Sequence, residues 1–250
     1  MPAGSARSTV WLSSRCWRRR SPQPAAIRSL SPALPETPAG VHALDQKVHF
    51  DTDCSIPPEK YPFVLNTMLP PDIRVLEGME VPPDFHARFL TSGKTYTYRI
   101  WNARHASAMR RNTHWHIPVP LDAEPVRRAL DTLPGKHDFA AFQAAGGTAK
   151  TTVRTLRSAQ LEICGNEWIL TVSGDAFLYN MVRIIAGTAA EIGLGQLSAD
   201  AFTRAFETGD RLALGMTAPA HGLELTQVRY PEEAFTDPAK LRWHEDDAST

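Results

Sequence analysis

The chain has 250 residues, of which 42% are hydrophobic, and it carries 27 basic and 27 acidic side chains. This composition is typical of a folded protein with one large core or two modest ones, and it argues against a disordered chain. No apolar run approaches the ~20 residues that span a bilayer, so we expect no membrane partner. The three cysteines are widely spaced, without a metal-ligand pattern or a disulfide framework, which indicates a reducing compartment.

Charge is unevenly distributed along the sequence. Residues 1–35 contain six arginines and no acidic residue, which leaves 21 basic against 27 acidic side chains in the rest. Such a leader has the composition of an organellar transit peptide or of a disordered tail. We predict that residues 1–36 form no strand or helix packed on the body, because Ser13–Ser21 lacks the apolar 3.6-residue period that would dock a helix.

The first half of the remaining chain predicts a mixture of strands and one helix, without internal repeats. Lys94–Trp101 alternates between apolar and polar residues, so Tyr96, Tyr98 and Ile100 should lie on one face of a strand. In chain order, the expected elements are a strand at Val48–Phe50, a helix at Pro57–Leu69, short strands at Ile73–Leu76 and Met79–Val81, and the strand Lys94–Trp101.

The second half repeats this mixture. Asp122 is a good N-cap for a helix, and Gly165-Asn166 is a credible hairpin turn between two apolar runs. Phe139 and Phe142 are expected in the core. The expected elements are a helix at Glu124–Leu133, strands at Leu156–Cys164 and Trp168–Val172, helices at Phe177–Ile192 and Ser198–Glu207, and a closing strand at Leu223–Val228.

One short motif is more informative than any of these elements. Ala39-Gly40-Val41-His42-Ala43 closely resembles the segment around the nucleophilic aspartate of the tRNA pseudouridine synthase A family, which reads Gly-Arg-Thr-Asp-Ala-Gly-Val-His-Ala. The resemblance covers Thr37 to about Pro231. Further matching segments follow in the family's order at Asn66–Pro70, Asp84–Phe89, Lys94–Arg99, His137–Phe139, Arg154–Leu156, Phe177–Arg183 and Pro219–Leu223.

The resemblance implies a fold, a substrate and an assembly. The fold class is α+β, with two similar domains whose antiparallel sheets join across a central RNA-binding cleft. The activity is that of an isomerase that converts uridine to pseudouridine in the tRNA anticodon stem-loop, as a cytoplasmic homodimer without metal or cofactor. On this basis residues 1–36 are a non-family leader, 37–104 the remnant of an incomplete N-terminal domain, 105–232 the C-terminal domain and 233–250 a tail.

The motif lacks the residue that the chemistry requires. The family's aspartate carboxylate attacks the nucleoside, but Pro38 occupies that position here and Glu36 occupies the position of the arginine. Proline offers no nucleophile and fixes φ in the loop. Asp45 is the next carboxylate along the chain, and a displacement of even ~1 Å can cost two orders of magnitude in rate. We therefore expect the chain to be inactive as given.

Two further residues are assigned by the resemblance. Arg183, in the apolar context Met181–Ile185, corresponds to the arginine that pairs with the catalytic aspartate and orients it. A helix-surface arginine with a packed stem is the alternative. Tyr96 corresponds to the tyrosine that contacts the target base, and its ring could stack on an extruded uracil. A half-buried strand aromatic is the alternative.

The histidines and surrounding cations carry weaker assignments. His42 is structural or faces RNA, while His86 and Arg88 support the active-site loop or bind phosphate, and the sequence does not separate these roles. His114 and His116 form a pair without a nearby third ligand, so no metal site is predicted.

The genetic code offers an origin for the leader. If each codon is read from the last base of the preceding one, permitted codons turn Ser13–Ser21 into Val-Gln-Gln-Val-Leu-Glu-Glu-Ala-Leu, which resembles the family's first helix. We therefore hypothesise that residues before about Ala39 come from a frameshifted gene. Two functions remain open: a tRNA pseudouridine synthase damaged at its N-terminus, which we favour, and a catalytically dead tRNA-binding module.

Overall fold

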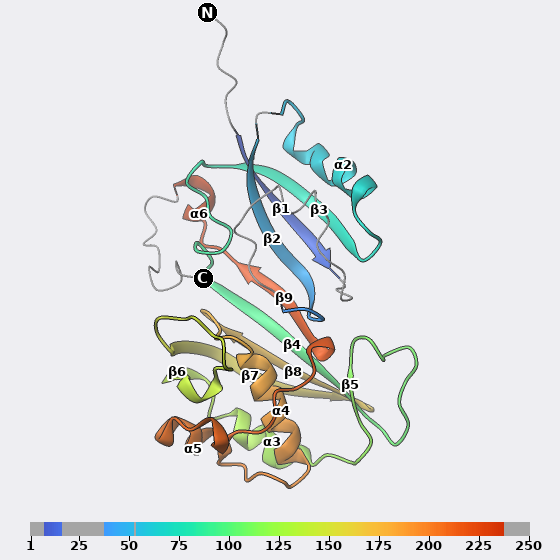
Figure 1. Cartoon of the computed structure of the whole chain (residues 1–250), viewed down its shortest axis with the longest axis vertical. Coiled ribbons are helices and arrows are strands. Elements are labelled where there is room, and N and C mark those ends of the chain that lie inside the picture. The colour runs from blue at the N-terminus through green and yellow to red at the C-terminus, as the bar shows by residue number, and fades with distance from the viewer. Residues whose placement is uncertain (1–7, 17–37, 53, 238–250) are drawn as a thin grey trace, which may run out of the picture. The chain divides into compact units, whose positions relative to one another are not determined.

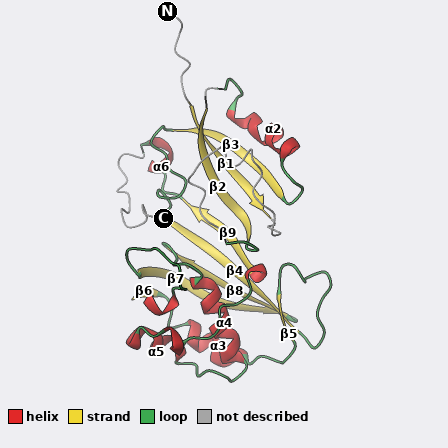
Figure 2. Ribbon diagram, viewed as in Figure 1, coloured by secondary structure: helices red, strands yellow, loops and turns green. Residues whose placement is uncertain are grey.

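The structure is a computed structural model that describes residues 8–16, 38–52 and 54–237 (Figure 1). The chain divides into two compact units, one comprising residues up to Ser92 together with those from Gln227, and the other comprising Gly93–Thr226. Helices and strands are mixed in both, and the pairing of strands is mostly antiparallel (Figure 2). The predicted α+β class is confirmed at this level.

The sheet of the N-terminal unit is organised around its first strand. β1 (Ser8–Cys16) pairs antiparallel with both β2 (His42–Thr52) and β3 (Ile73–Val81), so its backbone hydrogen-bonding groups have partners on both sides. The two short strands expected around residues 73–81 are therefore one continuous strand.

The prediction that residues 1–36 contain no packed strand is wrong for β1. Val10 and Leu12 are each only 1% exposed, and both belong to the core of the N-terminal unit. They are two residues apart and so lie on the same face of a strand, a period that a search for helical spacing misses. The predicted absence of packed structure in residues 1–7 and 17–36 lies outside the described residues.

One helix covers this sheet. α2 (Tyr61–Met68) follows the short 3-10 helix η1 (Pro58–Lys60), as predicted for this segment, and contributes Tyr61 and Leu65 to the same core as Val10 and Leu12. Asn66 fixes the helix to β3, since its side-chain amide donates to the carbonyl of Val75 and accepts from the amide of Val75, both at 2.8 Å. The remaining core members are Phe50, Leu69 and Val75, with Val48, Ile56 and Ile73 packed against them.

In the C-terminal unit the strands are paired in the order β4-β8-β7-β6, and β5 (Trp115–Ile117) pairs parallel with β4. β4 (Gly93–Asn102) and the hairpin of β7 (Val153–Cys164) and β8 (Glu167–Gly174) confirm the predicted strands. Further elements are β6 (Gly135–Asp138), α5 (Ala201–Thr208), the 3-10 helices η2 (Ala140–Phe142), η3 (Arg211–Ala213) and η4 (Ala220–Gly222), and β9 (Leu223–Arg229), which crosses between the two units along the chain.

Two helices cover one face of this sheet. α3 (Ala123–Leu130) begins at Asp122, whose carboxylate accepts from the amide of Glu124 at 3.1 Å, as expected of an N-cap. α4 (Met181–Gly193) is almost wholly buried. Side chains from both helices, from β4, β7 and β8, and from the segment before α3 form a small apolar pocket, lined by Ile100, Leu121, Val126, Leu161, Trp168, Leu170, Ala189 and Ala190. Phe139 and Phe142 are fully buried, as predicted.

The division of the chain differs from the boundaries predicted at residues 104 and 232. β4 belongs with the C-terminal unit because it pairs with β8 from Lys94 to Trp101. The expected tail contributes α6 (Glu233–Thr236), whose Ala234 is fully buried in the N-terminal unit against Phe85 and its neighbours. Among the described residues, no helix is both long and apolar enough to cross a membrane.

The role of β1 is testable by deleting one buried side chain. Leu12→Ala should lower the free energy of unfolding by about 2 to 5 kcal/mol, because it opens a cavity in the core. Leu76→Ala, at a position on β3 that is 45% exposed, should change it by less than about 0.5 kcal/mol. Urea titrations of both variants provide the measurement. Equal free energies of unfolding for the two variants would contradict the placement of β1 in the core.

Candidate functional site

The turn before β2 contains Pro38, the residue expected at the position of the nucleophile. The amide of Val41 donates to the carbonyl of Pro38 at 3.1 Å, and Gly40 adopts a φ of 88°, a left-handed conformation that favours glycine. Val41 is fully buried, which anchors the turn to the N-terminal unit. Glu36 lies outside the described residues. The turn therefore has a well-defined backbone, but Pro38 gives it no nucleophilic side chain.

Asp45, the next carboxylate after the turn, is already engaged. One of its oxygens forms an ion pair with Lys47, and the other accepts a hydrogen bond from the amide of Val228 at 2.8 Å. All three residues belong to the N-terminal unit. Moving Asp45 to serve as a nucleophile would break both interactions, which agrees with its exclusion on sequence grounds.

Tyr96 lies on β4 beside an aromatic partner. Its ring meets that of Phe177 edge to face, with centroids 5.1 Å apart and an interplanar angle of 83°. Burial raises the pKa of Tyr96 to about 12, so the phenol stays protonated at neutral pH. A neutral aromatic ring held in a fixed orientation is suited to stacking on a nucleobase.

Tyr98, two residues further along the same strand, has a structural role. Its hydroxyl donates to the carbonyl of Pro219 at 2.8 Å, and a Cβ added to Gly222 would come within 2.6 Å of its ring. Burial raises the pKa of Tyr98, and the nearby positive charge of Arg183 opposes this shift. Tyr98 thus joins β4 to the segment before β9 and lies close to Arg183.

Arg183 is held by neutral acceptors. Its Nε donates to the carbonyl of Ala218 at 2.7 Å, and its Nη1 donates to the side-chain oxygen of Asn180 at 2.8 Å. Burial lowers the pKa of Arg183. No carboxylate lies within ion-pair distance of Arg183 in the described part of the chain. The guanidinium is therefore fixed in orientation but lacks a negative partner there.

Asn180 positions this arginine through an unusual backbone conformation. Its φ of 59° and ψ of 8° are left-handed, and it is the only non-glycine residue with positive φ in the described ranges. Asparagine tolerates this conformation better than most residues. The turn delays the start of α4 to Met181, which corrects the helix predicted from Phe177.

The segment of residues 215–218 packs directly against α4. The amide of Ala218 donates to the carbonyl of Arg183 at 3.0 Å, and the hydroxyl of Thr188 accepts from the amide of Gly215 at 3.0 Å. A Cβ on Gly187 would lie 1.8 Å from the carbonyl oxygen of Met216, so only glycine fits there. This close approach fixes the segment whose Ala218 carbonyl accepts the hydrogen bond from Arg183.

The structure places Tyr96 and Arg183 in the same unit and connects them through one segment. Tyr96 contacts Phe177, and the chain continues from Phe177 through Asn180 to Arg183. The two side chains make no direct hydrogen bond with each other. The sequence assigns no role to the carbonyl of Ala218, or to Phe177 and Asn180 within the matching segment Phe177–Arg183, although an asparagine near a helix start is a signal for a left-handed residue.

His86 and Arg88 form part of a compact turn in the N-terminal unit. Nδ1 of His86 accepts from the amides of Arg88 and Phe89 at 3.2 and 3.4 Å, and its ring stacks on Phe89 with centroids 4.2 Å apart. Burial, with smaller contributions from His49 and Arg88, lowers the pKa of His86 to about 4. These contacts favour the support of the loop over phosphate binding. His42 is buried at the start of β2.

The His114 and His116 pair is engaged in local contacts. Nε2 of His114 lies 2.9 Å from a carboxylate oxygen of Glu167, and Nε2 of His116 lies 2.8 Å from the carbonyl of Ala103. Among the residues that the structure describes, no group of three potential metal ligands occurs.

Comparison with known proteins supports the resemblance seen in the motifs. A family profile described as tRNA pseudouridine synthase matches residues 129–231. The tRNA pseudouridine synthase A of Halalkalibacterium halodurans is 46% identical over 212 residues, which cover 83% of this chain and 81% of that protein. The corresponding protein of Acetivibrio thermocellus is 44% identical over 194 residues, which cover 78% and 80%. That of Ruminiclostridium cellulolyticum is 43% identical over 195 residues, again 78% and 80%.

The position of Asn180 yields a stability prediction. Asn180→Gly removes the hydrogen bond to Arg183 but suits the left-handed backbone, whereas Asn180→Ala removes the bond and adds strain. The free energy of unfolding of the alanine variant should therefore be about 1 kcal/mol lower than that of the glycine variant. Urea denaturation of the two variants measures the difference. An alanine variant as stable as the glycine variant would contradict the left-handed conformation.

Proposed function

Because the chain belongs to the tRNA pseudouridine synthase A family, we propose that it binds tRNA and presents a uridine of the anticodon stem-loop to Tyr96. The family's reaction is an isomerisation in which the bond from uracil N1 to the ribose breaks, the base turns, and C5 forms the new bond. Family resemblance also implies a homodimer, which equilibrium sedimentation tests.

The arrangement of Tyr96 and Arg183 is the observation that supports this proposal. Tyr96 is a neutral ring kept in place by Phe177, and Arg183 is a cation kept in place by Asn180 and the carbonyl of Ala218. The first group suits an extruded base, and the second suits a carboxylate that the reaction would use. The contacts that hold both side chains come from residues of the C-terminal unit.

We further propose that the chain as given does not isomerise uridine. Pro38 stands at the family's aspartate position, and Asp45 is committed to Lys47 and the amide of Val228. Arg183 has no carboxylate partner in the described ranges. Pro38→Asp alone should not restore turnover, because Glu36 still occupies the position of the family's arginine.

A catalytically dead tRNA-binding module is the second candidate. The observation that supports it is the fixed placement of Tyr96 and Arg183, which binding could use without a nucleophile. The nucleotide sequence upstream of the Val41 codon discriminates between the two. A shifted reading frame that encodes the family's helix and its Arg-Thr-Asp-Ala-Gly loop indicates a damaged enzyme, whereas an unbroken frame that matches this chain indicates a binding module.

Binding of tRNA should depend on the ring of Tyr96. Tyr96→Ala should weaken the affinity for a tRNA transcript about tenfold, because stacking contributes ~1 to 3 kcal/mol per base. Tyr96→Phe keeps the ring and should bind within about twofold of the unchanged chain. Fluorescence anisotropy with labelled tRNA measures both. An alanine variant that binds as tightly as the phenylalanine variant would argue against a stacked base at this position.

A further inference from the structure

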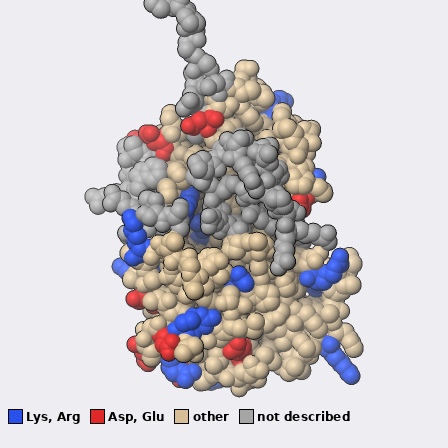
Figure 3. All heavy atoms as spheres, viewed as in Figure 1, with Lys and Arg blue, Asp and Glu red and all other residues tan. Residues whose placement is uncertain are grey.

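A loop in the C-terminal unit combines positive charge with exposure far from Tyr96. It comprises residues 103–114, between β4 and β5, and we call it the β4-β5 loop. It contains Arg104, Arg110 and Arg111, and no acidic residue occurs from residue 103 to residue 121. The lower right edge of Figure 3, where this loop lies in Figure 1, shows Lys and Arg side chains without acidic ones.

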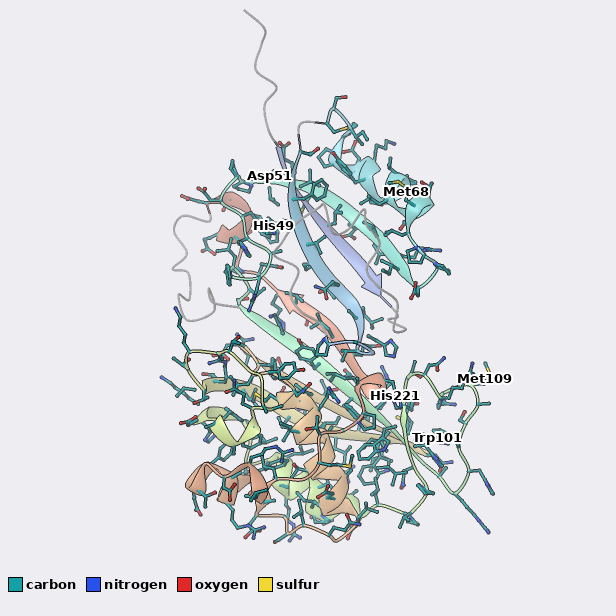
Figure 4. The ribbon with its side chains drawn as sticks, in the orientation of Figure 1. His49, Asp51, Met68, Trp101, Met109 and His221 are labelled. Carbon is teal, nitrogen blue, oxygen red and sulfur yellow. The ribbon has the colours of Figure 1, made fainter. Side chains whose placement is uncertain are left out.

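The tip of the loop faces solvent. Met109 is 89% exposed, and Figure 4 shows it at the outer end of the loop, directed away from the sheet. Arg104 and Arg111 are also exposed. Nη1 of Arg111 donates to the carbonyl of Ala108 at 2.7 Å, which leaves its other guanidinium N–H groups available.

The base of the loop is braced by internal contacts. The indole N–H of Trp101 donates to the carbonyl of His105 at 3.1 Å, and the guanidinium of Arg110 lies over the Trp101 ring, 4.4 Å from its centroid. One carboxylate oxygen of Glu167 lies 2.9 Å from Nε2 of His114, and the other lies 3.8 Å from Nη2 of Arg110. These contacts order the loop before any partner binds. Binding therefore loses less conformational entropy than it would with a disordered loop.

Arg110 is thus used inside the protein, while Arg104 and Arg111 remain directed to solvent. Seven residues along β4 separate Tyr96 from residue 103, which corresponds to roughly 20 Å at ~3.3 Å per residue. The loop and the ring of Tyr96 therefore belong to different parts of the surface of one unit. A ligand that reaches both must be extended and negatively charged.

We propose that the β4-β5 loop binds phosphates of the RNA backbone through Arg104 and Arg111, at a distance from the nucleotide that stacks on Tyr96. The nature of the partner rests on the proposed function. A second copy of the chain is less suited to this loop, because a two-fold contact of the loop with itself would bring like charges together. Backbone contacts of this kind supply affinity and register without reading sequence.

The test compares two double variants that remove equal charge. Arg104→Ala with Arg111→Ala removes the proposed contacts. Arg127→Ala with Arg128→Ala removes two exposed arginines from α3, where Glu124 and Asp131 lie nearby in sequence. Binding of a tRNA transcript is measured over a range of salt concentrations, and thermal melting confirms that both variants fold.

The loop variant should bind more weakly, and the slope of log affinity against log salt should become less steep by about 2, one for each lost phosphate contact. The α3 variant should keep the slope of the unchanged chain. An unchanged slope in the loop variant would overturn the inference, as would loss of self-association in that variant without a change in slope.

The same experiment separates this inference from the proposed function. If Tyr96→Ala weakens binding but the loop variant leaves the salt slope unchanged, only the role of the loop fails. If the unchanged chain does not bind tRNA, the proposed function fails and the inference fails with it.

Discussion

The fixed guanidinium of Arg183 is the constraint on which the candidate site depends. A half-buried cation needs acceptors, and here they are the carbonyl of Ala218 and the side chain of Asn180. The first acceptor requires the close packing of Gly187 against the carbonyl of Met216, and the second requires a left-handed asparagine at the helix start. The packing of α4 thus determines where the charge lies, and burial lowers the pKa of Arg183 without removing its charge at neutral pH.

The N-terminal unit contains a packed strand in a segment that matches no family motif. β1 pairs on both sides and buries Val10 and Leu12, although its sequence shares no motif with the family. A central strand needs backbone pairing and alternating apolar residues, and many sequences meet that requirement. A nucleophile, in contrast, requires one residue type at one position. Pro38, which we propose stands at the position of the family's aspartate, offers no carboxylate.

Local signals made much of the fold predictable. Alternation located β4, the Gly165-Asn166 turn located the β7-β8 hairpin, and Asp122 located the start of α3. Prediction failed where tertiary context decided the outcome. The pairing of β4 with β8 moved the unit boundary to residue 93, and the left-handed Asn180 shortened α4. For the site, family motifs are the basis on which we propose Tyr96 and Arg183, whereas the backbone carbonyl of Ala218 leaves no mark on side-chain patterns. A helical period does not reveal β1, because its buried residues Val10 and Leu12 follow the two-residue period of a strand.

The measurement that tests the central claim most directly is tritium release from tRNA labelled at C5 of uridine. The purified chain, at concentrations sufficient for stoichiometric binding, should release no tritium above background, because neither Pro38 nor Asp45 supplies a positioned carboxylate. The relative from Halalkalibacterium halodurans, 46% identical, serves as the positive control. Release by the unmodified chain beyond one equivalent per protein would contradict the account, since the chemistry would then not depend on an aspartate at the position of Pro38.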